Sequence, residues 1–227
     1  MSNAVMSRIA RPEPPLTPSA NKLVAGALAV WFALVVVLGA RGTFAGAPGT
    51  PPLAIFVGFA VPIALFFGLY RFLPAFRTFV LGLDLQLVTA IQAWRFAGLG
   101  FIALYTYGVL PGTFAWPAGL GDIAIGLTAP WVMQALARRP QFAASKGFVA
   151  WNALGILDLF DAIGTGTASS LLAVGAVGEV TTAPMARLPL VLIPAFFVPI
   201  FFMLHVTALI QSRRLARAAD GRDSATR

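Results

Sequence analysis

Six polar side chains lie within otherwise apolar stretches of the sequence, and their types suit ion binding or proton binding. They are Arg95, Asp122, Asn152, Asp158, Asp161 and His205. A charged side chain inside a membrane costs roughly 3 kcal/mol on insertion scales, so it usually faces the interior of a helix bundle and indicates a functional site. We therefore take these six residues as candidate ligand-binding or proton-binding residues.

The three carboxylates predict a site that binds a proton or a cation. Asp158 and Asp161 are three residues apart and share a helix face. If Asp122 faces them in a dry site, repulsion and burial keep a proton on at least one carboxyl group. The alternative is structural: Asp122 caps the start of its helix, while Asp158 and Asp161 hydrogen-bond to neighbouring helices.

Arg95 and His205 each allow a functional and a structural interpretation. Arg95 could bind an anionic headgroup or substrate, pair with a carboxylate, or extend to the nearby headgroups. His205 is the only histidine, so one chain cannot hold a haem between two histidines. A hydrogen bond across the bundle is the commoner role for such a residue.

Enzymatic chemistry and metal binding are poorly supported by the residue types. The chain has no cysteine, which excludes disulfides and thiolate ligands, and the usual zinc-ligand spacings are missing. Ser169 and Ser170 are expected at the far side of the membrane from His205, where they cannot use it as a base. A metal-diphosphate site would need a second acidic cluster. We therefore predict no catalytic residue, metal or cofactor, and a membrane-embedded lipid-modifying enzyme is the least favoured function.

The composition places these residues in a membrane protein. The 227 residues are 59% hydrophobic and only 11% charged, with a mean hydropathy of +0.85, whereas soluble domains are about 25% charged. The net charge of +8 comes from short basic clusters between apolar stretches, which do not suggest nucleic-acid binding. We predict an all-α polytopic membrane helix bundle whose partner is the lipid bilayer; a homo-oligomer is compatible with it.

Six stretches of nearly 20 residues are long enough to cross a hydrocarbon core of roughly 30 Å. The expected spans are 23–40, 53–70, 92–110, 117–137, 147–166 and 188–211. The first is longer than the roughly 7 to 15 apolar residues of a secretory signal, so we expect a retained helix. Residues 72–91, interrupted by Pro74, Arg77 and Asp84, predict one interfacial or re-entrant helix.

Three regions follow from these spans. Residues 1–22 are expected to form a disordered cytoplasmic tail, residues 23–211 the transmembrane domain, and residues 212–227 a basic cytoplasmic tail. In the sixth span, Pro194 and Pro199 remove backbone hydrogen bonds, which predicts a bend.

The basic residues predict the orientation. Thirteen of the sixteen lysines and arginines fall on one set of alternating loops and tails, two on the other set, and Arg95 lies within a span. This asymmetry predicts a bacterial inner-membrane protein with both termini in the cytoplasm. Counting about 1.5 Å per helical residue from the span ends sorts the polar residues by depth. The expected inner set is Arg95, Asn152 and His205, and the expected outer set is Asp122, Asp158 and Asp161.

Four motifs in a fixed order resemble those of an uncharacterised family of small bacterial multi-pass integral membrane proteins. They are QAWR at 92–95, LPGTFAWPAGLGD at 110–122, WNALGILDLFDA at 151–162 and IPAFFVPIFFMLH at 193–205. The resemblance covers residues 92–210 and implies no reaction, ligand or site. The predicted function is therefore to bind or move a small solute, proton or lipid through a polar intramembrane site. The alternative is a structural or accessory membrane subunit without its own ligand.

Overall fold

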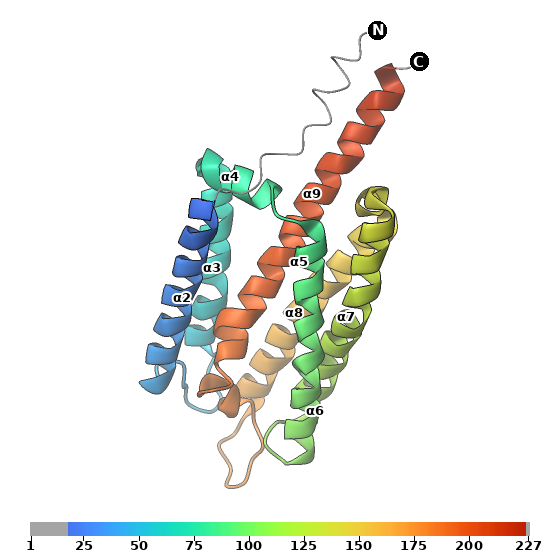
Figure 1. Cartoon of the computed structure of the whole chain (residues 1–227). Coiled ribbons are helices and arrows are strands. Elements are labelled where there is room, and N and C mark those ends of the chain that lie inside the picture. The colour runs from blue at the N-terminus through green and yellow to red at the C-terminus, as the bar shows by residue number, and fades with distance from the viewer. Residues whose placement is uncertain (1–17, 226–227) are drawn as a thin grey trace.

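The computed structural model describes residues 18–225, and within this range the regular structure is entirely helical. The α-helices are α2 (Pro18–Ala40), α3 (Leu53–Phe72), α4 (Pro74–Leu81), α5 (Leu85–Ile91), α6 (Leu99–Thr106), α7 (Gly112–Arg138), α8 (Lys146–Leu172) and α9 (Val198–Ala225) (Figure 1). Short helical segments are η1 (Gln92–Gly98), η2 (Pro140–Ala144), η3 (Ala183–Ala186) and the π-helical turn η4 (Ile193–Phe197). The predicted all-α bundle is confirmed. Of the predicted tail 1–22, residues 1–17 lie outside the described range, and α2 already includes residues 18–22.

Six helical stretches are long and apolar enough to cross a membrane. They are Asn21–Ala40, Leu53–Phe72, Leu85–Thr106, Gly112–Arg138, Lys146–Leu172 and Ile193–Ala218. Their outward faces carry large apolar side chains such as Val30, Leu65 and Leu157, each more than half exposed in the isolated chain. Burying such surface in lipid rather than leaving it in water is favourable, which supports a bilayer environment.

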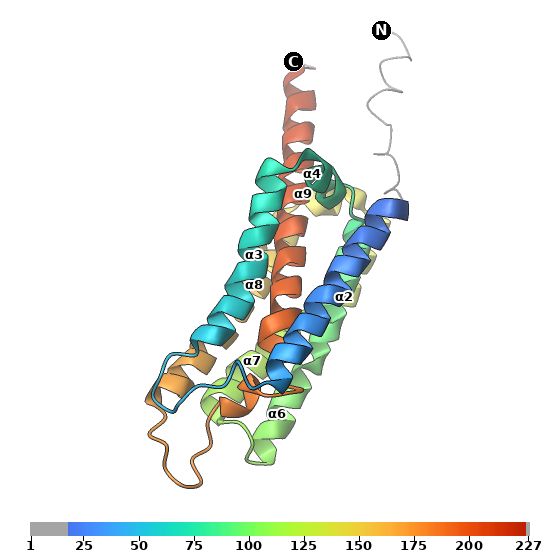
Figure 2. The same cartoon turned by 90° about the vertical axis from the view of Figure 1, so that its left-hand side faces the viewer.

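The third membrane-crossing stretch begins earlier than the sequence predicts. Asp84 caps α5, its Oδ1 accepting a hydrogen bond of 2.8 Å from the Gln86 amide, and α5, η1 and α6 then run on as one stretch from Leu85 to Thr106 (Figure 1). The predicted non-spanning helix over 72–91 is therefore only α4. Pro74 opens α4, and Figures 1 and 2 show it across one end of the bundle.

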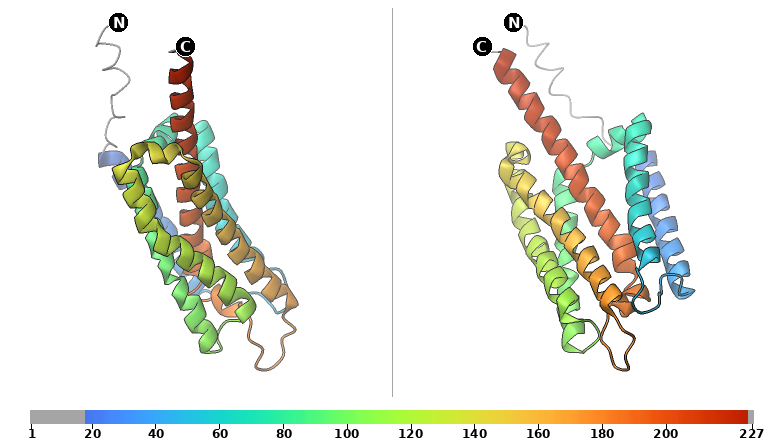
Figure 3. Two further views of the ribbon diagram at one scale, coloured as in Figure 1. Left: turned by 90° about the vertical axis from the view of Figure 1, so that its right-hand side faces the viewer. Right: turned by 180° about the vertical axis from the view of Figure 1, so that it is seen from behind.

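The described basic residues gather at that same end, which we call the basic end. It contains the start of α2, α4, the α7–α8 connection and the C-terminal part of α9 (Figure 3). Its basic residues are Lys22, Arg71, Arg77, Arg138, Arg139, Lys146, Arg213, Arg214 and Arg217. The opposite end, which we call the loop end, has the connections 41–52, 107–111 and 173–192 with only Arg41 and Arg187.

Helices α7, α8 and α9, together with η1, enclose buried polar residues in the interior of the bundle. A Cβ atom added at Gly126 of α7 would lie 2.8 Å from the carbonyl carbon of Arg95 and 2.9 Å from Cα of Phe96. Only a glycine therefore lets α7 lie directly against the backbone of η1. On the other side of the bundle, Phe59 of α3 packs with Leu159 and Phe202 in an apolar cluster. The contact at Gly126 therefore fixes η1, and with it Arg95, against α7.

Where the sequence predicts a bend in the sixth span, the structure has the π-helical turn η4 directly before α9. Pro194 lies in the first turn of η4, where its missing amide hydrogen removes no established helical bond. A Cβ atom added at Gly58 of α3 would lie 3.2 Å from the Cβ of Ala195. The turn is therefore packed closely against α3, at the loop end of the bundle.

Candidate functional site

Arg95 is the centre of a buried polar network. Its residue is only 1% exposed, and its guanidinium group makes four hydrogen bonds. Nε donates to Asp122 Oδ1 at 2.6 Å, and Nη2 donates to Asp158 Oδ2. Nη1 donates to the Gly155 carbonyl and to His205 Nε2, both at 3.1 Å. One side chain of η1 thus joins α7, α8 and α9.

The partners of His205 determine its protonation. Arg95 can only donate, so His205 Nε2 must be the acceptor in the contact between them. The hydrogen of the neutral ring then lies on Nδ1, which donates to Asn152 Oδ1 at 2.9 Å. This leaves the Asn152 amide group to donate to the Phe148 carbonyl at 2.9 Å, as observed. The ring of Trp151 lies edge-on against the imidazole at 5.4 Å, so His205 is held in place and neutral.

Two glycines of neighbouring helices make room for this network. A Cβ atom at Gly155 of α8 would overlap the imidazole of His205, and a Cβ atom at Gly121 of α7 would overlap the carboxylate of Asp158. Close approach here needs small residues, as is common between membrane helices. Gly121 and Gly155 are therefore part of the site although they contribute no side chain.

The expected inner and outer sets do not form two separate sites, because Arg95 bonds to members of both. The error comes from the start of the third span. Counted from Leu85 rather than from Gln92, Arg95 is ten residues, or about 15 Å, along its helical stretch. Asp158 is twelve residues, or about 18 Å, along α8. Both lie near the middle of their helical stretches, and the Arg95 guanidinium bonds to interior partners on α7, α8 and α9 instead of extending toward a helix end.

The structure separates Asp161 from the other two aspartates. Its residue is exposed on the outer side of α8, so the expected cluster of three carboxylates is reduced to two. Asp122 lies ten residues inside α7, whose first helical residue is Gly112. The alternative role of Asp122 as a helix cap is therefore wrong.

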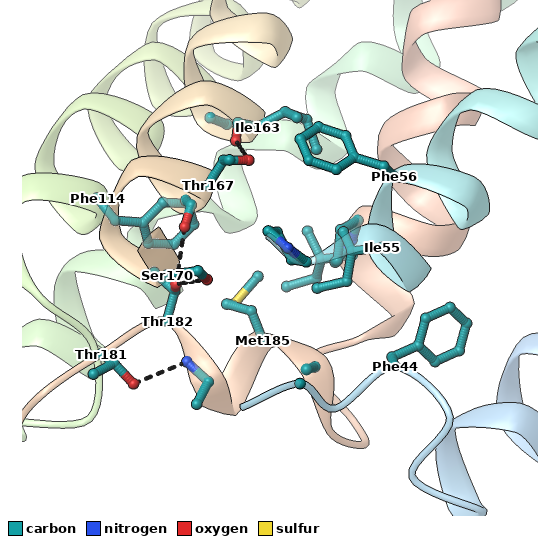
Figure 4. Close-up of a pocket in the computed structure, with 18 of the residues that line it drawn as sticks. Phe44, Ile55, Phe56, Phe114, Ile163, Thr167, Ser170, Thr181, Thr182 and Met185 are labelled. Carbon is teal, nitrogen blue, oxygen red and sulfur yellow. Dashed lines mark hydrogen bonds between the residues drawn. The ribbon is translucent and has the colours of Figure 1, made fainter. Parts of the chain in front are cut away.

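A cavity of about 250 Å³ leads from the loop end to Asp122. Its walls are mostly apolar, with Ile55 and Phe56 of α3 on one side, Ile163 of α8 on the other, and Met185 below them in the view of Figure 4. The hydroxyl groups of Thr167, Ser170, Thr181 and Thr182 also line it. All four hydroxyls are engaged in hydrogen bonds. Thr167 donates to the Ile163 carbonyl, Ser170 bonds to Thr182 at 3.1 Å, Thr182 donates to the Gly166 carbonyl at 3.0 Å, and Thr181 accepts from the Ala183 amide at 3.2 Å.

Asp122 and Asp158 each use one carboxylate oxygen in their hydrogen bond to Arg95. Among the described residues, neither Asp122 Oδ2 nor Asp158 Oδ1 has a hydrogen-bond partner. Their side chains are 17% and 13% exposed, and Asp122 lines the cavity. In the described part of the chain, no three His, Asp or Glu residues are grouped closely enough to hold a metal ion.

Sequence analysis does not identify Thr89 and Gln92 as site residues. Both are 1% exposed, and Gln92 Nε2 donates to the Phe201 carbonyl at 3.2 Å. Thr89 Oγ1 and Gln92 Oε1 lack a partner among the described residues. The signal was the spacing, since Thr89, Gln92 and Arg95 follow one another at intervals of three and share one helix face.

Outside the membrane-crossing stretches, Glu179 organises the turn at the loop end. Its carboxylate accepts hydrogen bonds from the amides of Val174, Gly175 and Ala176, at distances between 2.7 and 3.2 Å. These bonds stabilise the charged form and lower the pKa of Glu179. The turn is thereby held beside the cavity-lining residues of the same loop.

Comparison with known proteins assigns a family but no activity. No curated protein and no solved structure matches the chain. One family model, described as a domain of unknown function (DUF8737), matches residues 52–213. The match extends from the start of α3 into α9 and contains every residue of the Arg95 network. It begins at residue 52, whereas the first motif of the sequence analysis begins at residue 92. Since the match covers most of the chain, the protein belongs to the DUF8737 family.

Proposed function

We propose that the protein binds one proton or one small cation at the Arg95 network and exchanges it with the loop end through the cavity. One observation carries this proposal: two carboxylates, Asp122 and Asp158, share a single guanidinium group while His205 is neutral. The three charged groups therefore sum to one negative charge. An uncompensated charge is costly in a low-dielectric interior, and a proton or a cation on a free carboxylate oxygen neutralises it.

The cavity supplies the access that such a site needs. It contacts Asp122 directly and is lined by loop-end residues such as Thr50 and Thr181. Toward the basic end, the site is closed by buried apolar residues, among them Phe148, Val88 and Leu136. The proposal therefore has exchange on one side of the membrane in the described conformation, and transport would require a second conformation open to the basic end.

The second candidate function is a structural or accessory subunit. The observation in its favour is that Arg95 joins three helices through four hydrogen bonds, as a purely structural network would. A lipid-modifying enzyme is supported less well, because both ring nitrogens of His205 are already engaged by Arg95 and Asn152. We infer no catalytic role for it.

The proposed location is the inner membrane of a bacterium, with the basic end in the cytoplasm. The gathering of basic residues at that end supports this orientation. The described start of α2 and the C-terminal part of α9 lie at the basic end, which is consistent with two cytoplasmic termini. The cavity would then open to the periplasmic side.

Infrared spectroscopy of the protein in lipid tests the proton directly. We expect a protonated-carboxyl band that titrates with pH and is lost in both Asp122→Asn and Asp158→Asn, because one carboxylate then balances Arg95. Asp161→Asn, on the exposed side of α8, should keep the band, although the charge of Asp161 acts on Asp158 one helical turn away. Proton flux into proteoliposomes then separates binding from transport. If the two network variants leave the titrating band and the flux unchanged and only lower thermal stability, the accessory function is correct.

A further inference from the structure

The cavity has the features of a binding site for a small organic cation with an apolar body. We propose that it binds a lipophilic monocation, such as an ammonium group carrying a hydrocarbon substituent, with the positive group directed toward Asp122. This inference rests on the proposed function, because proton and cation would compete for the same uncompensated charge. It adds the chemical class of the ligand, which the proton site alone does not specify.

The distribution of charge along the cavity gives the ligand its polarity. At the inner end is Asp122, whose Oδ1 is occupied by Arg95 and whose Oδ2 has no partner among the described residues. The other charged lining residue is Arg187 in the loop-end part of the cavity. A ligand entering there meets a positive charge first and a negative group last, so its cationic group is favoured only at the inner end.

The walls favour an apolar body and also favour a cation. Four phenylalanines line the cavity: Phe44, Phe56, Phe101 and Phe114. Aromatic faces attract ammonium groups, with a larger effect where water is excluded. The hydroxyl groups of Thr167 and Thr182 donate to backbone carbonyls, so their remaining oxygen lone pairs offer acceptors but no free hydrogen. Thr181 accepts a hydrogen bond from the Ala183 amide and keeps its own hydrogen. The donors for an anionic group therefore lie at the loop end, at Thr181 and Arg187, and not beside Asp122.

Size and charge number further restrict the ligand. The volume of about 250 Å³ is below the range of roughly 300–1,000 Å³ typical of pockets for drug-sized ligands, which indicates a body no larger than one ring or a short alkyl chain. The Arg95 network lacks one positive charge, so a single charge is matched and a dication is not. The same chemistry occurs in free amines and in the ammonium headgroup of a lipid.

The test compares benzyltrimethylammonium with neopentylbenzene, which has the same shape with carbon in place of the charged nitrogen. Binding to the full chain is measured by isothermal titration calorimetry in detergent, with empty micelles as the blank. We expect the cation to bind about tenfold or more tightly than the neutral compound. Equal affinity for the two compounds, or tighter binding of benzylsulfonate than of the cation, would overturn the inference.

Two pairs of variants locate the binding. Ala162→Phe places a ring in the cavity and should abolish binding, whereas Ala168→Phe on the exposed side of the same helix should not change it. Asp122→Asn should remove the preference for the cation but keep neopentylbenzene binding, and Asp161→Asn should change neither. If Ala162→Phe binds the cation as well as Ala168→Phe does, the site is elsewhere and the inference is wrong.

The pH dependence separates this inference from the proposed function. Around Asp122 the charged or titratable groups are Arg95, Asp158 and His205, with Arg187 farther along the cavity and Asp161 outside it. If cation and proton compete, cation binding weakens tenfold per pH unit at low pH and releases one proton. At low pH, cation binding without proton release would keep the inference and overturn the proton site. A titrating carboxyl band without a preference for the cation would keep the proton site and overturn the inference. The same experiment in nanodiscs with and without phosphatidylethanolamine shows whether a lipid headgroup competes for the site.

Discussion

Replacing Arg95 by methionine removes the only cation of the buried network while keeping a long apolar side chain. The substitution leaves four acceptors without their donor: Asp122, Asp158, His205 and the Gly155 carbonyl. Removing one partner of a buried ion pair typically costs about 3–5 kcal/mol, because the remaining charge stays buried. We expect Arg95→Met to lower the free energy of unfolding by about that amount.

The assay is unfolding by sodium dodecyl sulfate in mixed micelles, followed by tryptophan fluorescence. Arg77→Met is the matched control, since Arg77 is exposed. It donates to the carbonyls of Tyr70 and Arg71 and lies 5.7 Å from the centre of the Tyr70 ring, so its expected cost is about 1 kcal/mol or less. Removing the stranded carboxylates as well, in Arg95→Met/Asp122→Asn/Asp158→Asn, should restore most of the loss. A loss for Arg95→Met no larger than for Arg77→Met would refute the network as described.

Three further predictions concern the surroundings of the network and the loop end. Gly126→Ala should cost about 1–3 kcal/mol of unfolding free energy, because the added Cβ meets the backbone of η1. Gly100→Ala, with open space around it, should be neutral or stabilising in the same unfolding assay. Asn152→Ala leaves the buried Nδ1–H of His205 without an acceptor and should lower the free energy of unfolding by about 1–3 kcal/mol, whereas Asn152→Asp keeps an acceptor. An unchanged melting temperature in Asn152→Ala would contradict the assigned tautomer. The pKa of Glu179 is lowered from 4.5 on folding, so the stabilisation of its turn should be complete above pH 4.5 and should be lost as the pH falls below 4.5 through the folded pKa. The measurement is the amide NMR shift of Gly175, which should follow this titration in the native protein and not in Glu179→Gln.

Sequence analysis predicted the number of membrane-crossing helices well because hydropathy acts over a whole segment. A stretch of about 20 apolar residues has few alternatives to a spanning helix, and five of the six predicted spans lie within or close to the observed helices. The third was predicted to start at Gln92 instead of Leu85. Pro74, Arg77 and Asp84 suggested an interfacial segment, but Asp84 is a helix cap and the following residues belong to the crossing.

The two aspartates of α8 show why residue spacing could not define the site. Positions three apart on a helix differ by about 60° around its axis, so they share a face only approximately. The boundary between the interior and the outside of the bundle falls between Asp158, which bonds to Arg95, and Asp161, which is exposed. Only the packing of α7 and η1 against α8 sets that boundary.

By itself, the sequence determined the class of the protein, the approximate spans and the six polar residues from which any intramembrane site had to be built. These depend on local hydropathy and on the cost of placing charge in lipid, which each segment carries independently of its neighbours. The tertiary structure alone decided that Arg95, rather than the aspartates, is the centre of the site, that Asp161 is outside it, and that a cavity reaches Asp122. Those properties depend on helix rotation and on close approach at Gly121, Gly126 and Gly155, which arise only when the helices pack together.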